Sequence, residues 1–405
     1  MRILFVHQNF PAQFLHLAPA LAARGHDVAA LTAEDNPRAS PVRLFRYRKA
    51  EIPTAGGVWR SYAEMSERGL RVARAAVQMR DAMGYAPEIV FGHGGWGETL
   101  FLREVWPAAR HLTYAEFYYR SQGLDTGFDP EFPPPGPVPG IGTVARRAHL
   151  LQALADADAA LSPTRWQAST FPPELRGKIT VIHDGIDTLR VAPDPRARLV
   201  LPNGVALAAG DEVLTFVSRN LEPYRGYHIF MRALPEVLAR RPQAQVVILG
   251  GEGQSYGPPP PGPESWKARF LGEVQGRLDP SRVHFLGQLP YRHYLALMQV
   301  SRVHAYLTYP FVLSWSMLEA MSAGALVVAS ATPPVTEVIE DGRNGLLVDF
   351  FDVEGWARTL AEALADPARH DALRAAGRET IRAGYDLRGH CLPRQIAFVE
   401  GSAPD

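Results

Sequence analysis

The sequence predicts an α/β protein made of two Rossmann-like halves with parallel sheets. Short, continuously apolar segments alternate with longer helical patterns, as expected where strands are buried on both faces and helices cover them. The alternation stops in a stretch that carries Pro and Gly near residue 190 and restarts near residue 212. A chain of 405 residues is also long enough for two or three domains.

Composition and charge exclude several classes of protein. The 42 basic residues balance 42 acidic ones, so bulk charge favours no nucleic acid partner. A single cysteine, Cys391, excludes an intramolecular disulfide framework and a multi-cysteine metal site. No apolar run reaches the ~18–20 residues of a membrane-spanning helix. The first apolar segment is too short for a signal peptide, so a cytoplasmic protein is expected, with at most peripheral contact at the inner face of a membrane.

Seven strands are predicted in the first half. Helical patterns cover about 12–24 and a long stretch that ends near residue 83. Residues 123–143 carry repeated Gly and Pro and are expected to form a loop or flap. The predicted strands are 3–6, 27–32, 42–47, 89–91, 111–115, 159–162 and 179–182.

The second half repeats the alternation. Its predicted strands are 213–218, 245–249, 283–286, 303–308 and 326–329, and its predicted helices are 227–241, 266–278, 291–300, 315–323 and the tail 353–384. The expected organisation is therefore a domain at 1–190, a linker at 191–211, a second domain at 212–384 and a C-terminal segment at 385–405.

Two arginines follow the first strand of the second half. Arg219 ends the apolar segment, and Arg225 comes six residues later, before a helix. In an open α/β sheet, ligands bind outside the carboxyl ends of the strands. Two guanidiniums there could grip the oxygens of a diphosphate, and ordinary surface ion pairs are the alternative.

Two further strand ends in this half suit a phosphorylated ligand. Gly250 and Gly251 would let a ligand approach the backbone, although a plain turn explains them as well. Residues 309–324 turn from a strand into a helix whose first N–H groups and dipole suit a phosphate. Glu319, one turn in, either accepts hydrogen bonds from a ribose diol or closes a capping box with Ser316.

The first half offers a histidine and a carboxylate at strand ends. His93 follows a strand inside a glycine-rich segment, where it could bond a sugar hydroxyl or shuttle protons, and a structural role is equally open. Glu116 ends the next strand and has a weaker case. Residues 38–49 carry arginines among aromatic residues, which suits an anionic membrane or acceptor, or simply a solvated strand edge.

Taken in order, these segments resemble the family 4 retaining glycosyltransferases. In the first half the likeness is limited to the opening strand, His93 and 183–187 (HDGID). Such a resemblance implies a GT-B fold, in which two Rossmann-like domains face a central cleft. The second domain would hold a nucleoside diphosphate sugar and the first would shape the acceptor site. The likeness is specific over 213–350 and rests on Arg219, Arg225-Gly226, 246–253 (VVILGGEG), 283–287 (VHFLG), 318–324 (LEAMSAG) and 341–348 (DGRNGLLV).

The resemblance also implies roles for single residues. Arg219 and Arg225 would bind the diphosphate, with Arg225 at a position that the family fills with Lys. Glu319 would bind the ribose, and His93 would contact the transferred sugar. The donor site would be completed by Ser314, Trp315, Ser316 and Met317 at the helix start and by Gly250, Gly251, Leu286 and Gly287 near the base.

Two positions depart from the family's pattern. Phe311 stands where the first Glu of the family's E-x7-E motif touches the donor sugar, and 9–12 (NFPA) replace a glycine pair after the opening strand. Phe311 is therefore expected beside the donor sugar. The acceptor-side candidates are Glu116, Asn9, Phe10 and Gln13.

We therefore predict a metal-independent, retaining glycosyltransferase that moves a sugar from a nucleoside diphosphate to a hydroxyl. A carbohydrate, lipid-linked or other hydroxyl acceptor is expected, in polysaccharide, lipopolysaccharide or glycoconjugate synthesis, with no cofactor besides the donor. Two other classes stay open. A GT-B sugar-nucleotide epimerase would keep the donor pocket and need no acceptor, and a non-catalytic nucleotide-sugar-binding protein is suggested by Phe311.

Overall fold

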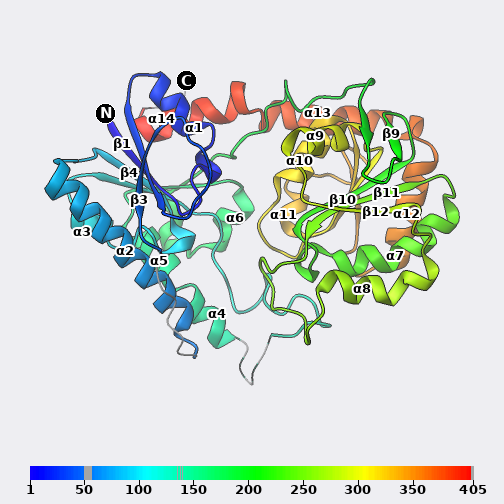
Figure 1. Cartoon of the computed structure of the whole chain (residues 1–405), viewed down its shortest axis with the longest axis horizontal. Coiled ribbons are helices and arrows are strands. Elements are labelled where there is room, and N and C mark those ends of the chain that lie inside the picture. Colours follow the sequence, from blue (N-terminus) through cyan, green and yellow to red (C-terminus); the bar gives the residue numbers. More distant parts are fainter. Residues whose placement is uncertain (50–56, 135, 137, 139, 403–405) are drawn as a thin grey trace. The chain divides into compact units, whose positions relative to one another are not determined.

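The chain folds into two compact α/β units. The computed structural model describes residues 1–49, 57–134, 136, 138 and 140–402. Unit 1 comprises Met1–Gly185 and Arg388–Asp405, and unit 2 comprises Ile186–Leu387. In each unit, helices cover both faces of a parallel sheet (Figure 1). The predicted α/β class with two Rossmann-like halves is confirmed.

The sheet of unit 1 is parallel throughout its described strands. Its order is β3-β2-β1-β4-β5-β6-β7, which reverses direction between β1 and β4 as in doubly wound folds. The strands are β1 Arg2–Val6, β2 Asp27–Ala33, β3 Arg43–Tyr47, β4 Ile89–His93, β5 Arg110–Tyr114, β6 Ala159–Ser162 and β7 Ile179–Val181.

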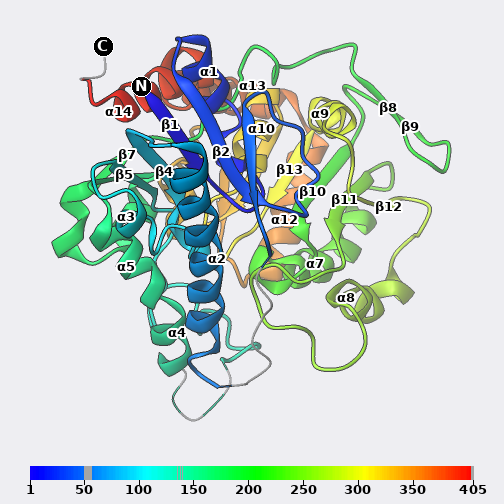
Figure 2. The same cartoon turned by 60° about the vertical axis from the view of Figure 1, so that its left-hand side comes forward.

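Alternating side chains of β1 anchor the two helical layers of unit 1. Ile3 and Phe5 share a core with helices α1 and α14, whereas Leu4 and Val6 share a core with α2 and α3. Figure 2 shows the long α2 running along its own side of this sheet. The helices are α1 Leu17–Ala23, α2 Arg60–Met83, α3 Leu102–Val105, α4 Gly140–Arg146, α5 Ala148–Asp156, α6 Arg165–Thr170 and α14 Leu392–Glu400, with 3-10 turns η1 Ala12–Phe14, η2 Gly94–Trp96 and η3 Pro173–Lys178.

The sheet of unit 2 has the same winding. Its order, β12-β11-β10-β13-β14-β15, reverses between β10 and β13. The strands are β10 Val213–Asn220, β11 Gln245–Gly251, β12 Val283–Gly287, β13 Val303–Tyr306, β14 Leu326–Ser330 and β15 Leu346–Val348. Central strands read as continuous apolar runs because both faces are covered.

The helices of unit 2 also form two layers. Helices α9, α10 and α13 contribute to one buried core with alternate strand residues such as Val213 and Val247. On the other face, Phe230 of α7 stacks on Phe216 of β10 with ring centroids 4.7 Å apart. The helices are α7 Tyr227–Arg240, α8 Trp266–Val274, α9 Tyr291–Val300, α10 Trp315–Ala323, α11 Pro333–Thr336, α12 Val353–Ala365 and α13 Asp371–Gly384, with 3-10 turns η4 Pro223–Arg225, η5 Gln275–Arg277 and η6 Ala368–His370.

The end of the chain returns to unit 1. A π-helical segment, Leu387–Cys391, precedes α14, which packs beside α1. Glu400 of α14 accepts hydrogen bonds from Arg24 and pairs with His26, and Arg110 donates to the Val399 carbonyl at 2.9 Å. The last helix is therefore an integral part of the first unit's core.

Three expected boundaries differ from the structure. Residues 191–211 are not a linker, because β8 Arg198–Val200 pairs antiparallel with β9 Ala206–Ala208 and their alternate leucines enter the core of unit 2. The expected flap at 123–143 gives way to α4 at Gly140, and its residues 135, 137 and 139 lie outside the described residues. The helix expected at 12–24 is split into η1 and α1.

Candidate functional site

The carboxyl edge of the second sheet brings several predicted residues together. Arg219 lies near the end of β10 with its side chain exposed, and it makes no hydrogen bond or ion pair with any described residue. The neighbouring strand β13 leads into the loop before α10, at the point where the strand order reverses. This is the position at which doubly wound sheets bind ligands.

Arg225 differs from Arg219 because it is buried, with 6% of its surface exposed. Its Nη1 donates to Oγ1 of Thr308 at 2.8 Å and to the carbonyl of Val312 at 2.9 Å. The pKa of Arg225 stays above its ordinary value although burial opposes this, because Tyr306, Tyr256 and Glu222 favour the charged form. Arg225 therefore ties the turn after β10 to the loop before α10.

Aromatic rings enclose the Arg225 guanidinium. It lies 5.1 Å from the ring centroid of Tyr256 and 5.7 Å from that of Phe311, which are cation–π distances. Those two rings are 4.8 Å apart, and Tyr224 contacts both Phe311 and Tyr309. Phe311, expected beside the donor sugar, is thus 2% exposed and packed against Arg225.

Glu222 holds the loop that carries Tyr256. Its Oε2 accepts the backbone N–H groups of Ser255 and Tyr256 at 3.4 and 3.3 Å. Burial raises the pKa of this carboxyl, and those N–H groups and Arg225 oppose the rise. The sequence pattern did not single out Glu222, because its role depends on a loop 33 residues further along the chain.

The start of α10 is capped from within the segment. Ser314 is the N-cap, its hydroxyl accepts the Ser316 N–H at 3.3 Å, and its own N–H donates to the Tyr306 hydroxyl at 2.8 Å. Trp315 is 40% exposed, whereas the Met317 side chain is fully buried. The helix start thus presents backbone rather than the Met317 side chain.

Glu319 is held by two tyrosines that the sequence did not identify. The hydroxyl of Tyr291 donates to Oε1 at 2.7 Å and that of Tyr294 donates to Oε2 at 2.6 Å. The capping-box alternative is wrong, because the Ser316 N–H is bonded to Ser314. Burial raises the pKa of Glu319, and the two hydroxyls oppose the rise. The i,i+3 spacing of the tyrosines just after Pro290 was the available signal.

The glycines near the predicted base site are needed for different structural reasons. A Cβ on Gly250 would lie 2.6 Å from Leu221, and one on Gly251 would lie 2.5 Å from Asn220, so both allow the turn after β10 to pack on β11. Gly287 has φ +61° and nothing within 4 Å of its Cβ position. Leu286 is half-buried beside it.

In unit 1, His93 and Glu116 meet at the carboxyl edge of the first sheet. His93 is 1% exposed, and its Nε2 lies 3.5 Å from Oε2 of Glu116. Gln13 donates to Glu116 at 3.4 Å, and the Asn9 N–H donates to Nδ1 of His7. Phe10, expected on the acceptor side, is instead a core residue, because its fully buried ring packs against Phe5.

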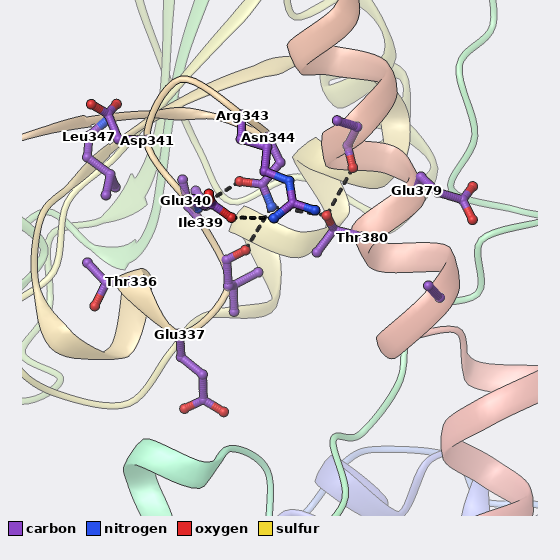
Figure 3. A pocket seen from close by; sticks show the side chains of 13 residues that line it. Thr336, Glu337, Ile339, Glu340, Asp341, Arg343, Asn344, Leu347, Glu379 and Thr380 are labelled. Atoms are coloured by element: carbon purple, nitrogen blue, oxygen red, sulfur yellow. Dashed lines mark hydrogen bonds and ion pairs between the residues drawn. The ribbon is translucent and has the colours of Figure 1, made fainter.

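A hollow of about 760 Å³ lies elsewhere on unit 2 and contains none of the predicted site residues. Figure 3 shows it between the turn after α11 and helix α13. Asn344 fastens that turn by donating to the Thr380 hydroxyl, and Arg343 pairs with Glu340. The carboxylates of Glu337, Asp341 and Glu379 would repel a diphosphate, so this hollow is a poor donor site.

The strand order and the residues at the carboxyl edge of the second sheet together define the structural class of the chain. Two doubly wound units of the same strand order, the second with an arginine and a capped helix start at its switch point, are the architecture of GT-B proteins.

The comparisons with known proteins give the family. The family model of the glycosyl transferase family 4 group matches residues 24–191, and that of glycosyl transferases group 1 matches residues 203–380. The chain therefore belongs to the family 4 glycosyltransferases.

Curated relatives match only part of this chain. The D-inositol 3-phosphate glycosyltransferase of a Nocardioides species is 29% identical over 281 residues, covering 67% of this chain and 58% of the relative. A GDP-mannose-dependent α-(1-6)-phosphatidylinositol monomannoside mannosyltransferase of Mycobacterium tuberculosis is 31% identical over 242 residues, covering 58% of each chain. The matched part spans less than two thirds of the length of these relatives.

Solved structures share the fold across nearly the whole chain. Sucrose-phosphate synthase from Thermosynechococcus elongatus superposes with a TM-score of 0.71 at 20% identity, covering 99% of this chain and 97% of the other. HepE from Anabaena, solved in complex with UDP-glucose, superposes with a TM-score of 0.69 at 16% identity, covering both chains completely. The GT-B fold is thus confirmed. Among the described residues no helix is both long and apolar enough to cross a membrane.

Proposed function

We propose that this chain transfers a glycosyl group from a nucleoside diphosphate sugar to a hydroxyl acceptor. Family membership supports the reaction class. The observation that carries the proposal is the exposed Arg219 near the end of β10, at the switch point of the second sheet, which makes no hydrogen bond or ion pair with any described residue. A permanently charged guanidinium and a helix N-terminus are the two groups that best bind a diphosphate.

On the donor side, Glu319 is the proposed ligand of the ribose. A carboxylate has about four lone-pair sites, and the two tyrosine hydroxyls use only two of them. The remaining sites can accept a ribose diol while the tyrosines hold the carboxylate in place. Gly287, whose Cβ position is open, is proposed to lie near the base.

The chemistry follows from where charge develops. Breaking the bond between sugar and phosphate builds negative charge on the leaving diphosphate, and preorganised positive groups stabilise that charge. We propose that Arg219 and the α10 start do this directly and without a metal. Buried Arg225 adds a second positive charge to this edge and positions the α10 loop through Thr308 and Val312. Retention of the anomeric configuration is proposed from the family resemblance.

The acceptor is proposed to be a carbohydrate or lipid-linked hydroxyl that meets His93 and Glu116 of unit 1. Relatives named for inositol phosphate and phosphatidylinositol mannoside acceptors support a polyol of this kind. We also propose that the reaction takes place in the cytoplasm.

A ligand screen followed by turnover tests this proposal. The full chain is heated with UDP-glucose, GDP-mannose and other nucleotide sugars, because a ligand at 100 times its Kd stabilises the folded chain by ~2.7 kcal/mol. Release of nucleoside diphosphate is then measured with sugar and polyol acceptors. We expect one donor to raise Tm and its nucleotide to be released only when an acceptor is present, with a glycosylated product.

Arg219→Ala should reduce that turnover by ~10²–10³, as loss of one preorganised charge does. The matched control is Arg343→Ala, another exposed arginine of unit 2, which should behave as wild type. Full activity of Arg219→Ala would contradict the proposal. An altered free sugar nucleotide would indicate an epimerase, and donor binding without turnover would indicate a binding protein.

A further inference from the structure

Two buried histidines lie side by side at the carboxyl edge of the first sheet, and the sequence pattern identified only one. Strands β1 and β4 are paired with Val6 opposite Gly92, so the next residues, His7 and His93, are neighbours. Their rings meet edge to face with centroids 5.5 Å apart. Only 3% of His7 is exposed. The pair sits where the strand order reverses, which is the ligand-binding point of such sheets.

The backbone determines which ring nitrogen carries the proton. The Asn9 N–H donates to Nδ1 of His7 at 2.9 Å, and the Gly95 N–H donates to Nδ1 of His93 at 3.0 Å. A nitrogen that accepts a hydrogen bond carries no proton, so the proton of each neutral ring is on Nε2. His183, after β7, repeats the arrangement with the Gly185 N–H.

His7 presents this donor without a charge. Burial lowers its pKa well below the ordinary value, the charges of His93, Arg38 and Arg68 lower it further, and an interaction with the Gln13 side chain opposes the fall. A neutral imidazole N–H can satisfy a hydroxyl oxygen but gives no ion-pair advantage to a phosphate.

Two other segments supply acceptors, and Nε2 of His93 is a second donor. Nε2 of His93 has no hydrogen-bond partner among the described residues and lies 3.5 Å from Glu116. Gln13 reaches Glu116 at 3.4 Å, and its side chain also interacts with His7, although its buried Oε1 has no partner at full hydrogen-bonding geometry among the described residues. The Glu116 side chain is 29% exposed, so a ligand can reach it.

These atoms match the hydrogen-bonding capacity of a hydroxyl group. Buried polar atoms nearly always have a partner in folded proteins. A hydroxyl can accept from an imidazole N–H and donate to a carboxylate at the same time. A phosphate dianion only accepts hydrogen bonds, and the Glu116 carboxylate would repel it.

We propose that His7, Gln13 and Glu116 bind hydroxyl groups of an uncharged polyol acceptor beside His93, and that His7 with Glu116 disfavours phosphorylated polyols. This inference rests on the proposed transfer to an acceptor held by unit 1. It adds His7 as a specificity residue and an uncharged polyol as the class of acceptor.

Saturation-transfer NMR on the full chain tests the inference. The probes are glucose, mannose and myo-inositol, each compared with its monophosphate. We expect at least one uncharged probe to bind, and its monophosphate to bind at least ten-fold more weakly. His7→Phe should weaken binding of the uncharged probe at least ten-fold. Glu116→Gln should reduce the difference in affinity between the probe and its monophosphate, because it removes the charge that repels the phosphate. The matched control, His26→Phe at the amino edge of the same sheet, should bind as wild type.

Three results would overturn the inference: no binding of any uncharged probe, equal or tighter binding of the monophosphates, or a His7→Phe chain that binds as wild type. If His7→Phe fails to fold, Glu116→Gln and the wild-type imidazole ¹⁵N spectrum decide, and a proton on Nδ1 of His7 would overturn it. Donor binding is measured on the same variants. A chain that binds a nucleotide sugar and no polyol contradicts this inference alone, and one that binds a polyol and no nucleotide sugar contradicts the proposed function alone.

Discussion

The two sheets have the same strand order, but the side chains at their carboxyl edges differ in charge. In unit 1 the reversal between β1 and β4 presents two buried histidines and a carboxylate. In unit 2 the carboxyl edge near the reversal between β10 and β13 carries the exposed Arg219 and the buried Arg225. The fold provides a candidate ligand site at each switch point. The residues at and just beyond the strand ends determine the charge of the ligand that would bind there.

A second difference is how each edge satisfies its polar groups. At the unit 2 edge, Arg225 and Glu319 both have short hydrogen bonds to neighbouring residues, although the buried Oε1 of Glu222 has none among the described residues. The unit 1 edge retains buried atoms without partners among the described residues, including Nε2 of His93 and Oε2 of Glu98. Arg225 and Glu319 are therefore held in place by neighbouring residues, whereas the unit 1 edge offers buried polar atoms that the proposed acceptor would satisfy.

The largest expected effect separates the two arginines of unit 2. Arg225→Leu should lower the free energy of unfolding by about 3 kcal/mol, because it leaves Thr308 and the Val312 carbonyl without their buried donor and Glu222 without its nearby charge. Arg219→Leu should change it by less than about 0.5 kcal/mol, because that side chain is exposed. Urea unfolding measures both, and equal losses in the two variants would mean that the arginines do not differ in role.

A smaller effect concerns a buried acid of unit 1. Glu98 is fully buried, accepts a hydrogen bond from Tyr47 at 2.6 Å, and burial raises its pKa to about 7. A pKa raised from 4.5 means that the folded chain holds the proton more tightly than the unfolded chain. The stability due to this group is thus present below about pH 4.5 and is lost as the pH rises to about 7.

Glu98→Gln should therefore stabilise the chain by about 2 kcal/mol at pH 8 and change it little at pH 4.5. His149 and His183, whose pKa values burial lowers to about 4, act in the opposite direction between pH 6.5 and 4. Since both proteins contain these histidines, the difference in Tm between variant and wild type isolates Glu98. If the difference in Tm between variant and wild type does not grow from pH 5 to pH 8, the pKa of Glu98 is not raised by burial.

The smallest effect tests the support of Glu319. Tyr294→Phe removes the shorter of the two hydrogen bonds that Glu319 accepts. The substitution should lower the free energy of unfolding by about 1.5 kcal/mol, as expected for a hydrogen bond to a carboxylate. Tyr291→Phe is the matched variant and should cost less, because Tyr291 is 42% exposed. If Tyr294→Phe leaves both the melting temperature and nucleotide binding unchanged, the tyrosines do not hold the carboxylate.

Patterns within short segments were sufficient for most of the fold. The apolar runs and helical periodicity identified β1–β7 and β10–β14 to within a few residues, because parallel strands buried on both faces leave a strong local signal, but they missed the edge strand β15. The same patterns misassigned 191–211, where Leu199 and Leu207 alternate into a core formed by residues far along the chain. Prolines and glycines in that stretch suggested a linker, although tertiary packing makes it a hairpin.

The site shows the same limit. Arg219, Glu319 and His93 were found because each lies near the end of a strand or in the first turns of a helix, where local sequence patterns are informative. Tyr294, Glu222 and His7 were missed because their roles depend on partners 25, 33 and 86 residues away.

Sequence alone determined two parallel α/β units, their strand ends and the family, since these depend on local periodicity and on short motifs. The tertiary structure alone decided that Arg225 lies buried while Arg219 is exposed, that tyrosines rather than a capping box hold Glu319, and that His7 joins His93. Burial, tautomer and pairing are properties of neighbours in space, and these neighbours meet only when the sheet of their own unit has formed.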